Sequence, residues 1–134
     1  MFRTYRCSPI TLFELQETVL KYINKQEKEI PFWNLITQPY SSLEDRCKNL
    51  AKSISFSTSI EKGESVIGGG TLPDVTLESP ILLINNEKTV DTVNQLIKND
   101  IPIIPRIIKD QVCLDLRSVF QNQDDIIVQA LNNS

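Results

Sequence analysis

The sequence predicts an α+β domain that is preceded by a separate amphipathic helix. From residue 41 onward, segments with helical spacing of apolar residues alternate with short segments of the period-two pattern that is typical of strands. Before residue 40, one long helical segment is set apart by a connector that contains Pro31 and Pro39. We therefore expect two units, a linking segment over residues 1–40 and a domain over residues 41–134.

The linking segment is predicted to hold a helix of about four turns. Its apolar residues recur at spacings of three and four, namely Leu12, Leu15, Val19 and Ile23. Two start signals are present: Ser8 followed by Pro9, and Thr11 with Glu14 three residues later in the pattern of a capping box. The helix should therefore be amphipathic and begin near Ser8.

The domain is predicted to contain three helices, over about residues 42–53, 89–98 and 124–131. The apolar stripe of the first consists of Leu43, Cys47, Leu50 and Ile54. The stripe of the second consists of Val90, Val93, Leu96 and Ile97. These stripes predict the helix faces that pack against a sheet.

Strands are predicted between the helices. Residues 54–60 and 65–67 read as two strands joined by a turn near Gly63, and two further short strands at 75–77 and 81–84 are separated by Ser79-Pro80. Residues 103–108 and 112–116 form a hairpin signal around Lys109-Asp110-Gln111, in which Pro105 favours an edge strand or a bulge. The order is that of a split β-α-β layer with helices on one face.

Composition narrows the classes of function. The chain has 134 residues, 40% hydrophobic and 23% charged, which is typical of one soluble globular domain. Its net charge of −3 gives no overall attraction to nucleic acid. No stretch is apolar enough for a membrane span and the start lacks the pattern of a signal peptide, so we expect a cytoplasmic protein.

The sequence contains no histidine and three widely spaced cysteines, Cys7, Cys47 and Cys113. The commonest general base is therefore missing, as is any triad that depends on histidine. No metal site is expected, because the spacing of the cysteines matches no metal-ligand pattern. The cysteines are expected to be small buried apolar residues.

Four strings, in order, resemble bacterial L-seryl-tRNA(Sec) selenium transferase, the selenocysteine synthase family. Arg3-Thr4-Tyr5-Arg6 before the first helix resembles the family's R-x-x-R-x-D-K-L-T-L segment. The others occupy residues 30–51 (IPFWNLITQPYSSLEDRCKNLA), 64–79 (ESVIGGGTLPDVTLES) and 102–119 (PIIPRIIKDQVCLDLRSV). The chain departs from the family at Ser8-Pro9 (Asp-Lys in the family), Asp74 (Gly) and Asp110-Gln111 (Asp-Gly). These departures affect local loop geometry, because glycine reaches positive φ at low cost.

The resemblance implies the small carboxy-terminal domain of a fold-type-I enzyme that depends on pyridoxal phosphate, preceded by a linking helix. That family converts seryl-tRNA(Sec) to selenocysteinyl-tRNA(Sec) with selenophosphate and forms homo-oligomers. Its cofactor lysine, in a Ser-Ser-Asp-Lys motif, would fall before Met1. This segment alone is therefore expected to bind no cofactor and to be inactive.

The resemblance also implies binding residues. Arg3 and Arg6 match the paired arginines that hold selenophosphate, and two guanidinium groups can clamp a tetrahedral oxyanion. Without the resemblance, two arginines near a chain end are expected to be solvated. The run Gly68-Gly69-Gly70 fits either a backbone loop near the active site or a bulge or turn between strands. Arg106 and Arg117 are expected to form surface salt bridges.

Two other functions fit the same residues. The chain could be a split subunit that another polypeptide completes. It could also be a non-catalytic interaction or dimerisation module that keeps the fold and surface of the family. We expect the genomic sequence before the codon for Met1 to distinguish these two functions from that of an enzyme fragment.

Overall fold

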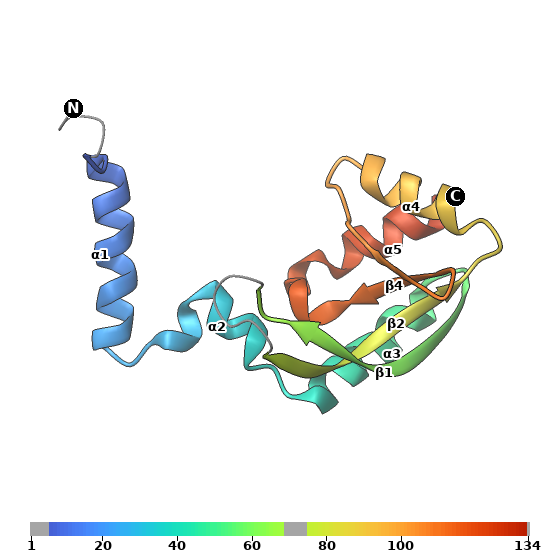
Figure 1. The fold of residues 1–134 in the computed structure, drawn as a ribbon, viewed down its shortest axis with the longest axis horizontal. Coiled ribbons are helices and arrows are strands. Elements are labelled where there is room, and N and C mark those ends of the chain that lie inside the picture. Colours follow the sequence, from blue (N-terminus) through green and yellow to red (C-terminus); the bar gives the residue numbers. More distant parts are fainter. Residues whose placement is uncertain (1–5, 69–74, 134) are drawn as a thin grey trace. The chain divides into compact units, whose positions relative to one another are not determined.

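The structure is a computed structural model that describes residues 6–68 and 75–133. The chain forms two compact units, one that ends at Thr37 and one that begins at Gln38. The first unit contains α1 (Pro9–Ile23), the short 3-10 helix η1 (Glu27–Glu29) and α2 (Pro31–Ile36). The second contains the sheet and the remaining helices (Figure 1).

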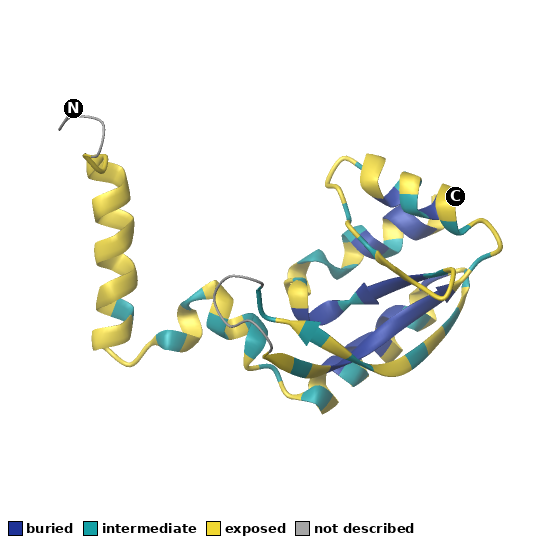
Figure 2. Ribbon diagram, in the orientation of Figure 1, coloured by how far each residue is buried: buried dark blue, intermediate teal, exposed yellow. Residues whose placement is uncertain are grey.

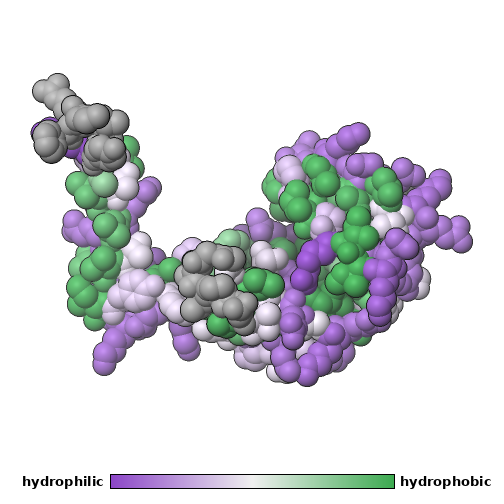
Figure 3. Space-filling model, in the orientation of Figure 1, coloured by the Kyte–Doolittle hydropathy of each residue, from purple (hydrophilic) through white to green (hydrophobic). Residues whose placement is uncertain are grey.

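Helix α1 begins where the sequence predicts. Ser8 is its N-cap and accepts a hydrogen bond from the backbone N–H of Thr11 at 3.1 Å, with Pro9 at the start of the helix. Of the two predicted start signals, Ser8-Pro9 is thus the one used. No residue of α1 is buried, and Figures 2 and 3 show its exposed, largely apolar surface.

A side-chain hydrogen bond joins α1 to α2 within the first unit. The indole N–H of Trp33 donates to the hydroxyl of Tyr22 at 2.7 Å. The rings of Phe32 and Trp33 meet edge to face, with 5.3 Å between their centroids. The first of these contacts ties α2, which begins at Pro31, to the end of α1.

The sheet of the second unit has four antiparallel strands in the order β1-β2-β4-β3. The strands are β1 (Ser57–Val66), β2 (Thr76–Asn85), β3 (Arg106–Ile108) and β4 (Gln111–Asp115). The helices are α3 (Tyr40–Ser53), α4 (Thr89–Lys98) and α5 (Asp124–Asn132), with 3-10 helices η2 (Leu116–Ser118) and η3 (Gln121–Gln123) before α5. This arrangement of helices and an antiparallel sheet agrees with the predicted α+β class, and the three helices confirm their predicted positions.

The main core lies between the three helices and one face of the sheet. Buried residues of β2 and β4 cluster there with residues of α3, α4 and α5: Leu82, Ile84, Val112, Leu114, Leu43, Leu96 and Ile127. Side chains alternate across a strand, so Ile81, Leu83 and Cys113 form a second cluster on the opposite face. Burial is concentrated on β2 and β4 for this reason (Figure 2).

The predicted breaks in the strands are wrong at two places. Gly63 does not form a turn but lies within β1, opposite Ser79. A Cβ on Gly63 would lie 2.5 Å from Cγ1 of Ile81, so glycine is needed there for close approach. Ser79-Pro80 also lies within a strand. Because β4 pairs with β2 only from Ile81 onward, no β4 partner depends on the N–H that Pro80 lacks.

The second predicted hairpin is confirmed as β3 and β4. Its turn consists of Lys109 and Asp110, whose φ values are 50° and 62°. Gln111 is already paired with Ile108, so it belongs to the strand and not to the turn. Two positive φ values match the twist of a tight hairpin, although this turn uses no glycine.

Within the described residues, no helix is long and apolar enough to cross a lipid bilayer.

Candidate functional site

The structure describes two of the five residues predicted to bind substrate or phosphate. Arg6 is exposed in the first unit, two residues before the N-cap of α1. Gly68, in the second unit, follows the end of β1 and has a φ of 154°. A Cβ at Gly68 would meet no atom within 4 Å, so its backbone conformation is the only described reason for glycine. Arg3, Gly69 and Gly70 lie outside the described residues.

A polar cluster around Asp115 includes Ser65, which lies three residues before Gly68 in the sequence. The Asp115 carboxylate accepts from the hydroxyl of Ser65 at 2.5 Å and from the hydroxyl of Ser79 at 2.8 Å. It also accepts from Arg106 Nη2 at 3.2 Å and from the backbone N–H of Arg117 at 3.1 Å. We call these five residues the Asp115 cluster. It joins the string at residues 64–79 to the string at residues 102–119.

Arg106 forms the predicted salt bridge, and it also makes a hydrogen bond to a distant strand. Its Nη1 donates to the backbone carbonyl of Glu64 at 3.1 Å, while its Nη2 pairs with Asp115. Glu64 is in β1 and Arg106 in β3, which are the opposite edges of the sheet. The side chain therefore crosses one face of the sheet and ties its two edges together.

Arg117 contradicts the expectation of a surface salt bridge. Its residue is only 7% exposed. Its Nη1 donates to the carbonyl of Gln38 at 2.9 Å and its Nη2 to the carbonyl of Glu78 at 2.8 Å. A buried guanidinium is stabilised by such hydrogen bonds, so Arg117 holds the start of the second unit to β2.

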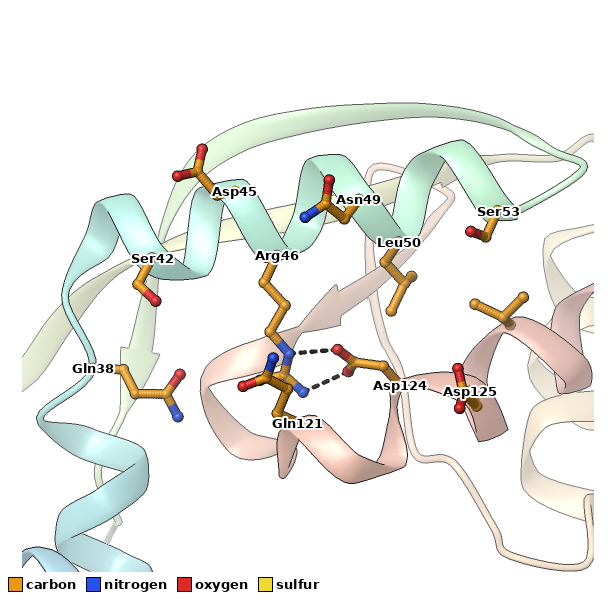
Figure 4. Close-up of a pocket in the computed structure, with 11 residues that line it drawn as sticks. Gln38, Ser42, Asp45, Arg46, Asn49, Leu50, Ser53, Gln121, Asp124 and Asp125 are labelled. Atoms are coloured by element: carbon orange, nitrogen blue, oxygen red, sulfur yellow. Dashed lines mark hydrogen bonds and ion pairs between the residues drawn. The ribbon is translucent and has the colours of Figure 1, made fainter.

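A second arginine centre connects α3 to the segment before α5. Arg46 donates to both carboxylate oxygens of Asp124, at 2.8 and 2.5 Å (Figure 4). It also donates to the carbonyls of Leu116 and Val119. It lies at a polar cavity of about 340 Å³ that Asp45 also lines. Among the described residues no group of histidine, cysteine and acidic side chains could hold a metal ion. The bidentate geometry makes this pair a structural contact between distant segments.

The cysteines divide into two kinds. Cys47 and Cys113 are buried, as predicted, whereas Cys7 is exposed and contradicts that prediction. Burial raises the pKa of the Cys47 thiol to about 12, and the thiol lies 3.8 Å from the carbonyl of Pro80. Burial also raises the pKa of Cys113. Both thiols therefore stay protonated at neutral pH and act as apolar core groups.

Comparison with known proteins gives the family. The model of the SelA family, L-seryl-tRNA selenium transferase, matches residues 1–120. The chain belongs to this family. The predicted resemblance is confirmed, and it covers the first unit and most of the second.

Three relatives show the extent of the match, all L-seryl-tRNA(Sec) selenium transferases. The enzyme of Clostridium perfringens is 32% identical over 139 residues, which cover 96% of this chain and 30% of the relative. That of Campylobacter jejuni is 28% identical over 98% of this chain and 29% of its own length. That of Clostridium botulinum is 30% identical over 95% and 29%. The chain thus spans about three tenths of these relatives, which fits a carboxy-terminal portion.

Sequence reasoning identified Arg106 and Arg117 but missed Asp115, Ser65 and Ser79. The hydroxyl of Ser65 and the carboxylate of Asp115 are 50 residues apart in the chain, and no local pattern predicts that they meet. The signal available was weak. All three fall inside strings that resemble the family, and Asp115 is a charged residue at the end of a buried strand.

Proposed function

We propose that this chain is the carboxy-terminal part of an enzyme that converts seryl-tRNA(Sec) to selenocysteinyl-tRNA(Sec) with selenophosphate. The observation that supports this most directly is the family match over residues 1–120, which covers the first compact unit and most of the second. In this proposal residues 41–134 are the small domain of a fold-type-I enzyme, and residues 1–40 link it to the larger part that the relatives possess.

Pyridoxal phosphate would supply the electron sink for the reaction at the serine β carbon. In the family, the lysine that binds the cofactor precedes the segment that this chain matches. The lysines that the structure describes in this chain are exposed or partly exposed. We therefore propose that the 134 residues alone bind no cofactor and transfer no selenium. In the complete enzyme this segment would contribute residues that bind substrate and the small domain that adjoins the larger part.

Arg6 and Arg3 are proposed to hold selenophosphate. Arg6 is exposed, so its guanidinium can reach an anion without first losing a buried partner. Each charge-assisted hydrogen bond to an oxyanion contributes roughly 1.5–3 kcal/mol. Near a chain end this gain is opposed by an ordering cost of about 1–2 kcal/mol per residue, so strong binding requires the complete enzyme.

A chimera tests this proposal. The part of the Clostridium perfringens enzyme that precedes its match to this chain would be fused to residue 1, and selenium transfer to seryl-tRNA(Sec) would be measured. We expect transfer in the chimera, and a loss of at least tenfold after Arg3→Ala with Arg6→Ala, with unchanged cofactor absorbance. Transfer at the unmutated rate would show that these arginines are solvated surface residues.

The control removes two other cations from the same unit. Lys25 and Lys28 are exposed, and the φ of Lys25 is 58°. Lys25→Asn with Lys28→Ala keeps that backbone conformation accessible, because asparagine tolerates positive φ. We expect this variant to transfer selenium at the rate of the unchanged chimera.

The exposed apolar surface of α1 supports a second candidate, an interaction or dimerisation module. Its large exposed side chains include Ile10, Leu12, Phe13, Leu15 and Ile23. Patches of this kind mark contacts with other chains or domains. A chimera that folds and loads cofactor but transfers no selenium, while remaining oligomeric in sedimentation, would favour this candidate over the enzyme.

A further inference from the structure

Asp115 is the residue at which all four strands meet. Its own strand is β4, and its carboxylate accepts a hydrogen bond from one side chain on each of the others: Ser65 of β1, Ser79 of β2 and Arg106 of β3. The Asp115 side chain is 11% exposed. A carboxylate that is nearly buried requires such donors, and four of them hold its two oxygens in one orientation.

The contacts of Asp115 and Arg106 act on one end of β1. Pairing between β1 and β2 ends at Val66 and Thr76, so the ladder does not hold the backbone beyond Val66. Just before this point Ser65 is held by Asp115, and the carbonyl of Glu64 is held by Arg106. Gly68 follows two residues after Val66. These two contacts therefore add side-chain support to the ladder at the end of β1, three residues before Gly68.

We propose that Asp115 is a positioning residue for selenium transfer: through Ser65 and Arg106 it fixes the end of β1 and, with it, the backbone at Gly68. The inference rests on the proposed function, because it takes Gly68 to lie beside the active site of the complete enzyme. Asp115 does not touch substrate in this proposal. It acts only through the strand that it holds.

The Arg46–Asp124 pair provides a matched control. It is also an arginine–carboxylate contact within the second unit, with the Arg46 side chain 8% exposed and the Asp124 side chain 23% exposed. It joins α3 to the start of α5, and none of its hydrogen bonds goes to β1 or to Arg106. Asp124→Asn should thus lower stability without moving the end of β1.

The first measurement is hydrogen exchange in the 134-residue chain. We expect Asp115→Asn to raise the exchange rates of the amides of Ser65 and Val66, at the end of the ladder with β2, at least tenfold relative to the unchanged chain. Asp124→Asn should leave these rates within about twofold of the unchanged chain, at a temperature where both variants are folded. Equal exchange at Ser65 and Val66 in the two variants would overturn the inference.

The second measurement uses the chimera described above. We expect Asp115→Asn to lower kcat for selenium transfer on the order of tenfold to a hundredfold, with little change in KM for seryl-tRNA(Sec), because misplaced groups slow the reaction more than they weaken binding. Arg106→Gln should have a similar effect, and the double variant should be no slower than either alone. Asp124→Asn should keep the unmutated kcat.

The outcomes separate the two proposals. If the unmutated chimera transfers selenium and Asp115→Asn does so equally fast, the positioning role is wrong and the proposed function stands. If the folded, cofactor-loaded chimera transfers no selenium, the proposed function fails and the positioning role fails with it.

Discussion

At the scale of single residues, Gly63 is a point of close approach between β1 and β2. A side chain there would begin 2.5 Å from Cγ1 of Ile81, which is buried on the face opposite the main core. We expect Gly63→Ala to lower the free energy of unfolding by about 1–3 kcal/mol, the usual cost of overpacking. Urea unfolding followed by circular dichroism measures this change.

A double-mutant cycle gives the control for Gly63. In an Ile81→Ala background the clashing Cγ1 is absent, so Gly63→Ala should cost much less than in the unchanged chain. An equal cost in both backgrounds would contradict the close-approach explanation and point to the conformational freedom of glycine instead.

Asp110 carries a different kind of strain. Its φ of 62° lies in the left-handed region, which costs most residues roughly 1–2 kcal/mol and glycine almost nothing. Its backbone carbonyl accepts from the hydroxyl of Thr89, a contact that any residue at this position keeps. We expect Asp110→Gly to raise the free energy of unfolding by about 0.5–1 kcal/mol and, with it, the melting temperature.

The control for Asp110 is Asp100→Gly. Asp100 is exposed and is not among the described residues with positive φ. Glycine there should slightly lower the melting temperature, because it adds conformational freedom to the unfolded chain. A fall in melting temperature for Asp110→Gly as well would contradict the strain argument.

At the scale of elements, α5 is part of the core although the match to the family model ends at residue 120. Ile127, Ala130 and Leu131 are buried, and Asp124 pairs with Arg46. A chain that ends at residue 120 should therefore lose its cooperative unfolding transition. Removing a buried isoleucine or leucine side chain costs about 2–5 kcal/mol, and a whole domain is stable by only about 5–15 kcal/mol.

Single substitutions in α5 test whether its buried side chains account for the stability that the helix contributes. Ile127→Ala should lower the free energy of unfolding by about 2–5 kcal/mol, while Gln129→Ala, on the exposed side of the same helix, should change it by less than about 0.5 kcal/mol. Calorimetry of the two variants and the shortened chain measures these effects. A truncated chain that melts cooperatively near the unmutated temperature would refute the role of α5.

Helices and strands differed in how far the sequence predicts them. The predicted boundaries of α3, α4 and α5 agree with the structure within about two residues, because capping residues and apolar stripes are local signals. β1 and β2 were each divided in two. Gly63 and Pro80 have the local chemistry of turns, and only cross-strand contacts with Ile81 and the limited length of β4 explain their place inside strands.

The candidate site was predictable only in its parts. Arg6 and Gly68 stand in strings that resemble the family, and Arg106 was expected to form an ion pair. Its partner Asp115, and the way Arg106 reaches Glu64 across the sheet, depend on contacts between segments up to 50 residues apart. Such contacts arise from strand register, which a single sequence specifies only weakly.

At the scale of the whole molecule, the lysines of this segment lack the environment of a cofactor lysine. A lysine becomes reactive when burial or a neighbouring cation favours its neutral amine. Among the residues that the structure describes no lysine is buried, and acidic partners raise the pKa of two of them, Lys48 beside Glu44 and Lys62 beside Glu78. Raised values keep these amines protonated at neutral pH, so both should react slowly with an aldehyde.

We therefore expect the 134-residue chain, mixed with one equivalent of pyridoxal phosphate at pH 7.5, to show no absorbance band that a single lysine substitution abolishes. After borohydride reduction, mass spectrometry should find weak adducts spread over several lysines, with Lys48 and Lys62 among the least modified. The full-length Clostridium perfringens enzyme, treated identically, serves as the positive control. A stoichiometric adduct on one lysine of this chain would contradict the proposal that the segment alone binds no cofactor, and would place an amine-activating site within residues 1–134.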